Sequence, residues 1–184
     1  MKLNKLITLV HAGHDLLIKT ASNLQSPLLL VVRLYWGWLF FQTGKGKLMD
    51  LSGPTQFFTE LGIPFPAFNA ALAGTTECVG GLLLLVGLAS RLAAIPLTIT
   101  MVVAYLTADL EAVKEIFSDP DKFLGAAPYH FLFASVLILA FGPGAFSLDR
   151  LIGPKLTAFF DQSRTNNAPP AKPFVHDSVR AIAH

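Results

Sequence analysis

One carboxylate, Glu77, stands near the middle of an apolar run of small residues that extends from Leu72 to the positive charge of Arg91. Ionisable groups are costly in hydrocarbon, and where they occur there they usually bind a ligand, move protons or hold helices together. Tyr105 and His130 lie in two further apolar stretches and can also donate or accept a proton. These three residues are the candidate catalytic groups, and they predict ligand binding with coupled proton transfer.

The candidate groups are expected to share one layer of a membrane. If each apolar stretch forms a spanning helix, a rise of about 1.5 Å per residue places this layer roughly 17 to 22 Å from the cytoplasmic face. Gln42 and Tyr105 should lean toward Glu77, because helical side chains point toward the N-terminus of their own helix. A proton path is then expected to lead outward to Asp109 and Lys47. The members of the layer are Gln42, Glu77, Tyr105 and His130.

Arg33 and two of the candidate catalytic residues have alternative interpretations. Arg33 lies about 9 Å from the cytoplasmic face, so it is expected to extend to that interface rather than to pair with Glu77. A ligand-binding role is the alternative for Arg33, and the other candidate ligand-binding residues are Gln42, Lys47 and Asp109. Glu77 is either a hydrogen-bonded acid that fixes helix packing or a proton or ligand group, and His130 is either an interfacial anchor or a ligand. The single cysteine, Cys78, excludes an intrachain disulfide and is expected to pack as a small apolar residue.

Small residues and histidines offer two weaker patterns. Four glycines are expected to allow close helix approach, namely Gly74, Gly80, Gly81 and Gly87. His11 and His14 lie one turn apart, but two imidazoles alone make a weak metal site, so a polar helix face is the simpler interpretation. We therefore assign no metal ligands.

The composition predicts a membrane protein. Hydrophobic residues make up 53% of the 184-residue chain, charged residues only 14%, and the mean hydropathy is +0.55. The net charge of +2 is too small to indicate a nucleic-acid partner, so the expected partner is the lipid bilayer.

These patterns predict an all-α fold, an integral membrane four-helix bundle with an N-terminal amphipathic interfacial helix. Residues 1–26 form that helix, which lacks the features of a signal peptide and is expected to be retained. Residues 27–152 form the membrane domain, with Pro27 at the start of the first span, and residues 153–184 form a largely disordered cytoplasmic tail. The four spans are expected at about 28–43, 67–89, 92–108 and 123–141.

Two connections should lie outside the membrane. A short interfacial helix is expected at 54–61 with Ser52 as its cap, and another short helix within the charged loop 109–122. Most of the 14 Lys and Arg residues fall on the side that holds both chain ends. The positive-inside rule therefore places both termini in the cytoplasm of a bacterial inner-membrane protein, with loop 109–122 facing outward.

Several of these residues together resemble the DoxX family. The match comprises Arg33, the Gly44-Lys45-Gly46-Lys47-Leu48 exit, the Glu77-x-x-Gly80-Gly81 segment up to Arg91, Ala104, and Gly142-Pro143-Gly144-x-x-Ser147-Leu148-Asp149. The resemblance covers about residues 27–152. It implies a small four-helix membrane protein of the kind found as a subunit of a thiosulfate:quinone oxidoreductase or in membrane-associated redox and thiol-stress complexes.

Two classes of function remain open. In the first, the chain is a membrane subunit of a redox-related complex, linked to quinone and to sulfur, thiol or oxidative-stress chemistry. It would be an oxidoreductase subunit without its own electron-carrying cofactor, because the sequence shows no haem, flavin or iron–sulfur motif. A quinone or a partner redox subunit would carry the electrons, and a homo-oligomer is the other candidate partner. In the second, it is a non-enzymatic membrane scaffold or small-solute carrier.

Overall fold

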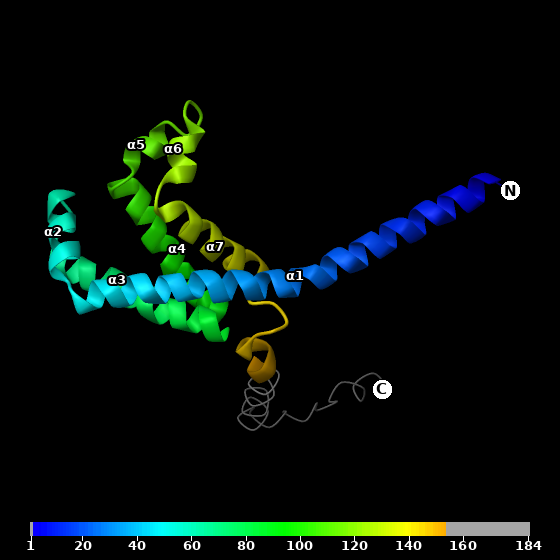
Figure 1. The fold of residues 1–184 in the computed structure, drawn as a ribbon, viewed down its shortest axis with the longest axis horizontal. Helices are drawn as coiled ribbons and strands as arrows, with labels where there is room; N and C mark the ends of the chain where they lie inside the picture. Colours follow the sequence, from blue (N-terminus) through cyan, green and yellow to red (C-terminus); the bar gives the residue numbers. More distant parts are fainter. Residues whose placement is uncertain (1, 154–184) are drawn as a thin grey trace, which may run out of the picture. The chain divides into compact units, whose positions relative to one another are not determined.

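The computed structural model describes residues 2–153, with side chains at residue 11 and at residues 13–153. Every regular element in this range is a helix (Figure 1). The expected disorder of the tail beyond residue 153 lies outside the described residues. The helices are α1 (Lys2–Met49), α2 (Ser52–Glu60), α3 (Pro66–Val86), α4 (Ser90–Thr107), α5 (Leu110–Lys114), α6 (Pro120–Gly125) and α7 (Pro128–Phe141).

Four of these helices pack together pairwise. α1 lies along α3, α4 lies along α7, and contacts of α3 with α4 and of α1 with α7 join the two pairs (Figure 1). Three helical segments are long and apolar enough to cross a membrane, namely Gly13–Met49, Pro66–Val86 and Ser90–Thr107. The chain is therefore a membrane protein that is helical throughout its regular elements at residues 2–153.

The core of these helices is small, and apolar side chains also cover their outer faces. Exposed examples are Leu92, Ile99 and Phe133, which are 69%, 57% and 52% exposed. Large exposed apolar surfaces of this kind are rare in soluble proteins and are typical of helices that contact lipid. The buried cluster consists of Val32, Phe40, Leu84, Ala93, Ala94, Leu97, Met101, Ala134 and Ile138.

α1 differs from the expectation. It runs without interruption through Pro27, so the helix of the first span does not begin at that residue. The division of this helix into an interfacial part and a span stays a prediction. Pro27 has no N–H, so the carbonyl of Asn23 loses its helical hydrogen bond. Asn23 is exposed, and water can donate to this carbonyl instead. The bonds on both sides then continue the helix.

The other boundaries agree more closely. α3 and α4 begin and end within about three residues of the predicted spans. The fourth apolar helix begins at Pro128 rather than at residue 123, because proline suits the first turn of a helix and not its interior. Ser52 is not the cap of α2 but its first residue, and its N–H instead donates to Asp50 Oδ1 at 3.0 Å.

A carboxylate after α7 caps α4 and holds two distant segments together. Asp149 accepts the N–H groups of Ala89 at 2.6 Å and of Ser90 at 3.0 Å, which would otherwise lack partners at the start of the helix. The N–H of Asp149 donates in turn to the carbonyl of Gly87 at 2.9 Å. The turn between α3 and α4 is therefore tied to the segment that follows α7.

Candidate functional site

The central feature of the site is a pair formed by Lys47 and Glu77. Lys47 lies in the last turn of α1, and Glu77 lies in the middle of α3. Lys47 Nζ donates to Glu77 Oε1 at 2.5 Å. The side chain of Glu77 is 2% exposed and that of Lys47 33%, so the carboxylate is buried while the ammonium group keeps partial access to the surroundings.

The two oxygens of the Glu77 carboxylate differ. Oε1 takes the proton donor of Lys47, whereas Oε2 is buried and has no hydrogen-bond partner among the described residues. A buried polar atom without a partner costs free energy, and such atoms often occur where a ligand or water binds. Oε2 is therefore the atom of this pair that is available to a further donor.

Close contact between α1 and α3 positions the pair. A Cβ on Gly44 would lie 2.2 Å from the backbone nitrogen of Cys78, and one on Gly81 would lie 2.4 Å from that of Phe41. Only glycine fits such distances, so the two backbones touch. Gly44 precedes Lys47 by three residues, and the helix contact thus brings a lysine from one helix to the carboxylate of the next.

The four glycines named from the sequence serve different contacts. Gly81 meets α1 and Gly80 meets Leu97 of α4, whereas Gly74 lies against the side chains at the end of α1. Gly87 adopts a left-handed backbone (φ 71°) as the C-cap of α3. Gly37 and Gly44 were missed as packing residues, although their seven-residue spacing repeats that of Gly74 and Gly81 and could have indicated the α1–α3 contact.

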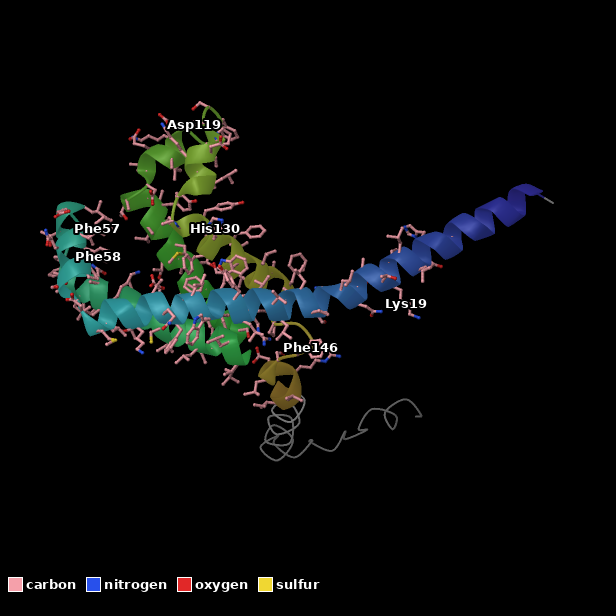
Figure 2. All side chains as sticks on the ribbon, viewed as in Figure 1. Lys19, Phe57, Phe58, Asp119, His130 and Phe146 are labelled. Carbon is pink, nitrogen blue, oxygen red and sulfur yellow. The ribbon has the colours of Figure 1, made fainter. Side chains whose placement is uncertain are left out.

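A large apolar cavity adjoins the pair. Its volume is about 1000 Å³, and both Lys47 and Glu77 line it. Phe57 and Phe58 of α2 contribute to its wall, and both are labelled in Figure 2. We call this space the apolar cavity; its other lining residues include Phe40, Leu61, Ile63, Leu72, Ile99, Met101, Val103, Asp109 and Phe131.

The predicted polar layer is not assembled. Tyr105 is buried, but its hydroxyl donates to the carbonyl of Phe123 at 2.8 Å rather than to Glu77. Gln42 is exposed on α1, and His130 is exposed on α7 beside the ring of Tyr129 (Figure 2). The layer prediction is corrected here, because the direction of each side chain around its helix, which depth alone does not determine, separates these groups.

Lys47 and Asp109 both line the apolar cavity together with Glu77. Lys47 contacts Glu77 directly, and Asp109 is half-buried in the wall of the cavity. The proton path from Glu77 to these two residues stays a prediction.

Arg33 is buried and bound to backbone carbonyls. Its side chain is 2% exposed, and its Nη1 and Nη2 donate to the carbonyls of Pro143 at 2.7 Å and Phe146 at 2.9 Å. The expectation that Arg33 and Glu77 do not pair agrees with these contacts. Arg33 instead joins α1 to the segment after α7, because two carbonyls there have no helical partners.

No group of three or more potential metal ligands among His, Cys, Asp and Glu occurs in the described residues. His11 and His14 are both exposed. Cys78 is partly buried and free.

Helices of this length and apolarity, with a buried carboxylate paired to a lysine, define a multi-helix integral membrane protein with an apolar cavity. The sequence profile of the DoxX family matches residues 28–110. The chain belongs to the DoxX family.

Three curated bacterial proteins are similar to this chain. Uncharacterized membrane protein Rv3486 of Mycobacterium tuberculosis is 36% identical over 72% of this chain and 85% of its own length. Putative oxidoreductase CatD of Bacillus subtilis is 31% identical over 56% of this chain and 69% of its own length. Inner membrane protein YqjF of Escherichia coli is 32% identical over 73% of this chain and 98% of its own length. No solved structure matches the chain.

Proposed function

We propose that the chain is a membrane subunit of a redox-related system and that it binds a quinone-class ring in the apolar cavity, with the Lys47–Glu77 pair at its polar end. The observation that carries this proposal is one buried ion pair in the wall of an otherwise apolar space of about 1000 Å³. The name of the Bacillus subtilis relative, an oxidoreductase, supports the same class.

The cavity suits such a ligand by size and by chemistry. Its volume lies at the upper end of the range for small-molecule sites, roughly 300 to 1000 Å³. A quinone combines a flat apolar ring and tail with two carbonyl oxygens that accept hydrogen bonds. The aromatic side chains Phe40, Phe57 and Phe131 offer ring contacts, and the ammonium of Lys47 offers a donor.

A bound quinone would supply the capacity to accept electrons and protons together. The chain's own contribution is to hold a proton between Lys47 Nζ and Glu77 Oε1, with the carboxylate buried. Since Lys47 is 33% exposed, its ammonium group can exchange protons with the surroundings while Glu77 stays buried. Electrons would come from a partner redox protein or from a second copy acting with one.

The finer topology is part of the proposal. α7 has 14 residues and spans about 21 Å, less than the roughly 30 Å of a bilayer core, so it would cross with the help of the adjoining α6 segment. With four crossings both termini share a side, and the distribution of Lys and Arg favours the cytoplasm of a bacterial inner membrane. Residues 1–26 would then lie at or beyond that interface.

The scaffold or carrier function remains the second candidate. The glycine contacts that place Lys47 beside Glu77 favour this function. An ion pair at the interface of two helices can stabilise their packing without binding a ligand. In that case the cavity would hold lipid or a small solute, and no electron-transfer partner would be required.

Quinone extraction from the purified full chain distinguishes the two functions. The protein is isolated from membranes in mild detergent, and its retained quinone is quantified and compared with Glu77→Gln, Lys47→Gln and Lys45→Gln. Lys45 is the matched control, because it is exposed two residues from Lys47 and does not line the cavity. Retention in the native protein and in Lys45→Gln, with at least a fivefold loss in the other two, is expected.

The contrary result is equally clear. If the native protein retains no quinone and takes up neither a short-chain benzoquinone nor a short-chain naphthoquinone in detergent, the quinone proposal is wrong. Equal quinone retention by the native protein and the three variants would show that the Lys47–Glu77 pair does not bind the quinone.

A further inference from the structure

We infer that a second cavity, separate from the apolar cavity, binds the phosphate headgroup of an anionic phospholipid. We call it the arginine cavity; it has a volume of about 680 Å³. It shares no lining residue with the apolar cavity. Its lining residues that matter here are Leu29, Arg91, Leu92, Phe141, Asp149 and Arg150.

The two arginines are free to bind an anion. Arg91 uses one nitrogen, Nη2, to donate to the carbonyl of Ala140 at 3.0 Å, and its other donors have no partner among the described residues. The side chain of Arg150 makes no hydrogen bond or ion pair within residues 11–153. Guanidinium groups present several N–H donors in a plane, which matches the oxygens of a phosphate.

The carboxylate in this cavity does not neutralise the arginines. Both oxygens of Asp149 accept backbone N–H groups, those of Ala89 and Ser90, at the start of α4. Arg33 lies close enough to Asp149 to interact with it electrostatically. The local charge is therefore positive, because three guanidinium groups accompany one carboxylate that is already hydrogen-bonded.

The position of the cavity favours a lipid over other anions. The apolar helix α7 ends here, and α3 and α4, which are long enough to span a membrane, end and begin here, so the cavity lies where these helices leave the hydrocarbon. Leu92 and Phe141 are 69% and 57% exposed and line the same cavity. A phosphate beside the arginines would thus be joined to acyl chains that cover these two apolar side chains.

The test uses the full chain in a neutral detergent. Phosphatidylglycerol, phosphatidylcholine and inorganic phosphate are each titrated, and the rise in thermal unfolding temperature is recorded. Phosphatidylglycerol is expected to stabilise the native protein, and Arg150→Gln and Arg91→Gln should each need about fivefold more of it for the same rise. Arg91→Lys, which keeps the charge, should lose less than Arg91→Gln, and Lys45→Gln should respond like the native protein.

Each other outcome overturns the inference. An equal response to phosphatidylcholine would show that charge is not recognised, and full stabilisation by inorganic phosphate alone would show that no lipid is needed. If Arg150→Gln responds to phosphatidylglycerol like the native protein, the arginine cavity is not the binding site. Because Arg150 has no side-chain bond to lose, this variant decides the test even if Arg91→Gln folds poorly through loss of its contact with Ala140.

Discussion

Lys47 Nζ lies 2.5 Å from Glu77 Oε1, and this contact joins the last turn of α1 to the middle of α3. The carboxylate is almost completely buried, whereas a third of the lysine side chain is exposed. The charge of Glu77 therefore depends on Lys47 more than the charge of Lys47 depends on Glu77. Without its partner the lysine can still reach polar surroundings, whereas the buried carboxylate cannot.

Removal of Lys47 should destabilise the protein more than removal of Glu77. Lys47→Met leaves a buried carboxylate without a partner and is expected to lower the free energy of unfolding by roughly 2 to 4 kcal/mol, between the values for exposed and buried pairs. Glu77→Leu should lower the free energy of unfolding by less than Lys47→Met does. The double variant should lose less than the sum of the losses in the two single variants. Thermal unfolding in detergent measures all three, with Lys45→Met as the control. Strictly additive losses would show that the pair is not coupled.

The backbone contact between α1 and α3 should tolerate no side chain at Gly44. Gly44→Ala places a Cβ against the backbone of Cys78 and is expected to lower stability by roughly 1 to 3 kcal/mol. Gly46→Ala is the matched control in the same helix, because nothing lies within 4 Å of its Cβ position. It should be neutral or stabilising, since alanine is the better helix former. Equal unfolding temperatures for both variants would contradict the close contact.

Loss of Arg33 should release the segment after α7. Arg33→Met leaves the carbonyls of Pro143 and Phe146 without their donors, and a loss of roughly 2 to 4 kcal/mol is expected. Arg33→Lys should keep only part of this stability, because an ammonium group lacks the planar arrangement of donors that reaches both carbonyls. Hydrogen exchange in residues 143–151 gives the local readout. Unchanged exchange there in Arg33→Met would argue against this connection.

The start of α2 should depend on pH through Asp50. Hydrogen bonds from the Ser52 hydroxyl and then from its backbone N–H lower the pKa of Asp50 below its ordinary value of 3.8. Since the folded pKa is the lower one, the stabilisation is complete above about pH 3.8 and is lost as the pH falls through the folded pKa. Ser52→Ala should raise that pKa, as followed by an NMR titration of the Asp50 carboxyl carbon. An unchanged titration in the variant would exclude the hydroxyl contact.

Much of the fold could be predicted from local patterns. Apolar runs of spanning length between Gly, Pro and charged residues indicated α3 and α4, and the Gly142–Gly144 turn indicated the end of α7. Pro27 misled the prediction, because a proline in an exposed part of a helix costs one hydrogen bond and does not force a break.

Both residues of the pair were predicted to belong to the site, but their direct contact was not. Glu77 could be identified because an acid in an apolar helix is unusual, and Lys47 was named only as an end of the outward proton path. Thirty positions separate Lys47 from Glu77, and Lys47 lay beyond the expected end of the first span, so nothing local connected them. Gln42, Tyr105 and His130 were expected to join Glu77, but the Tyr105 hydroxyl donates to the carbonyl of Phe123, and Gln42 and His130 are exposed.

The sequence by itself determined that the protein is helical, belongs in a membrane and holds a buried acid, because these properties follow from the apolarity and spacing of neighbouring residues. Only the tertiary structure decided which groups meet that acid. The rotation of each helix about its axis and the glycine contact between α1 and α3 set the direction of every side chain, and both arise from packing between segments far apart in the chain.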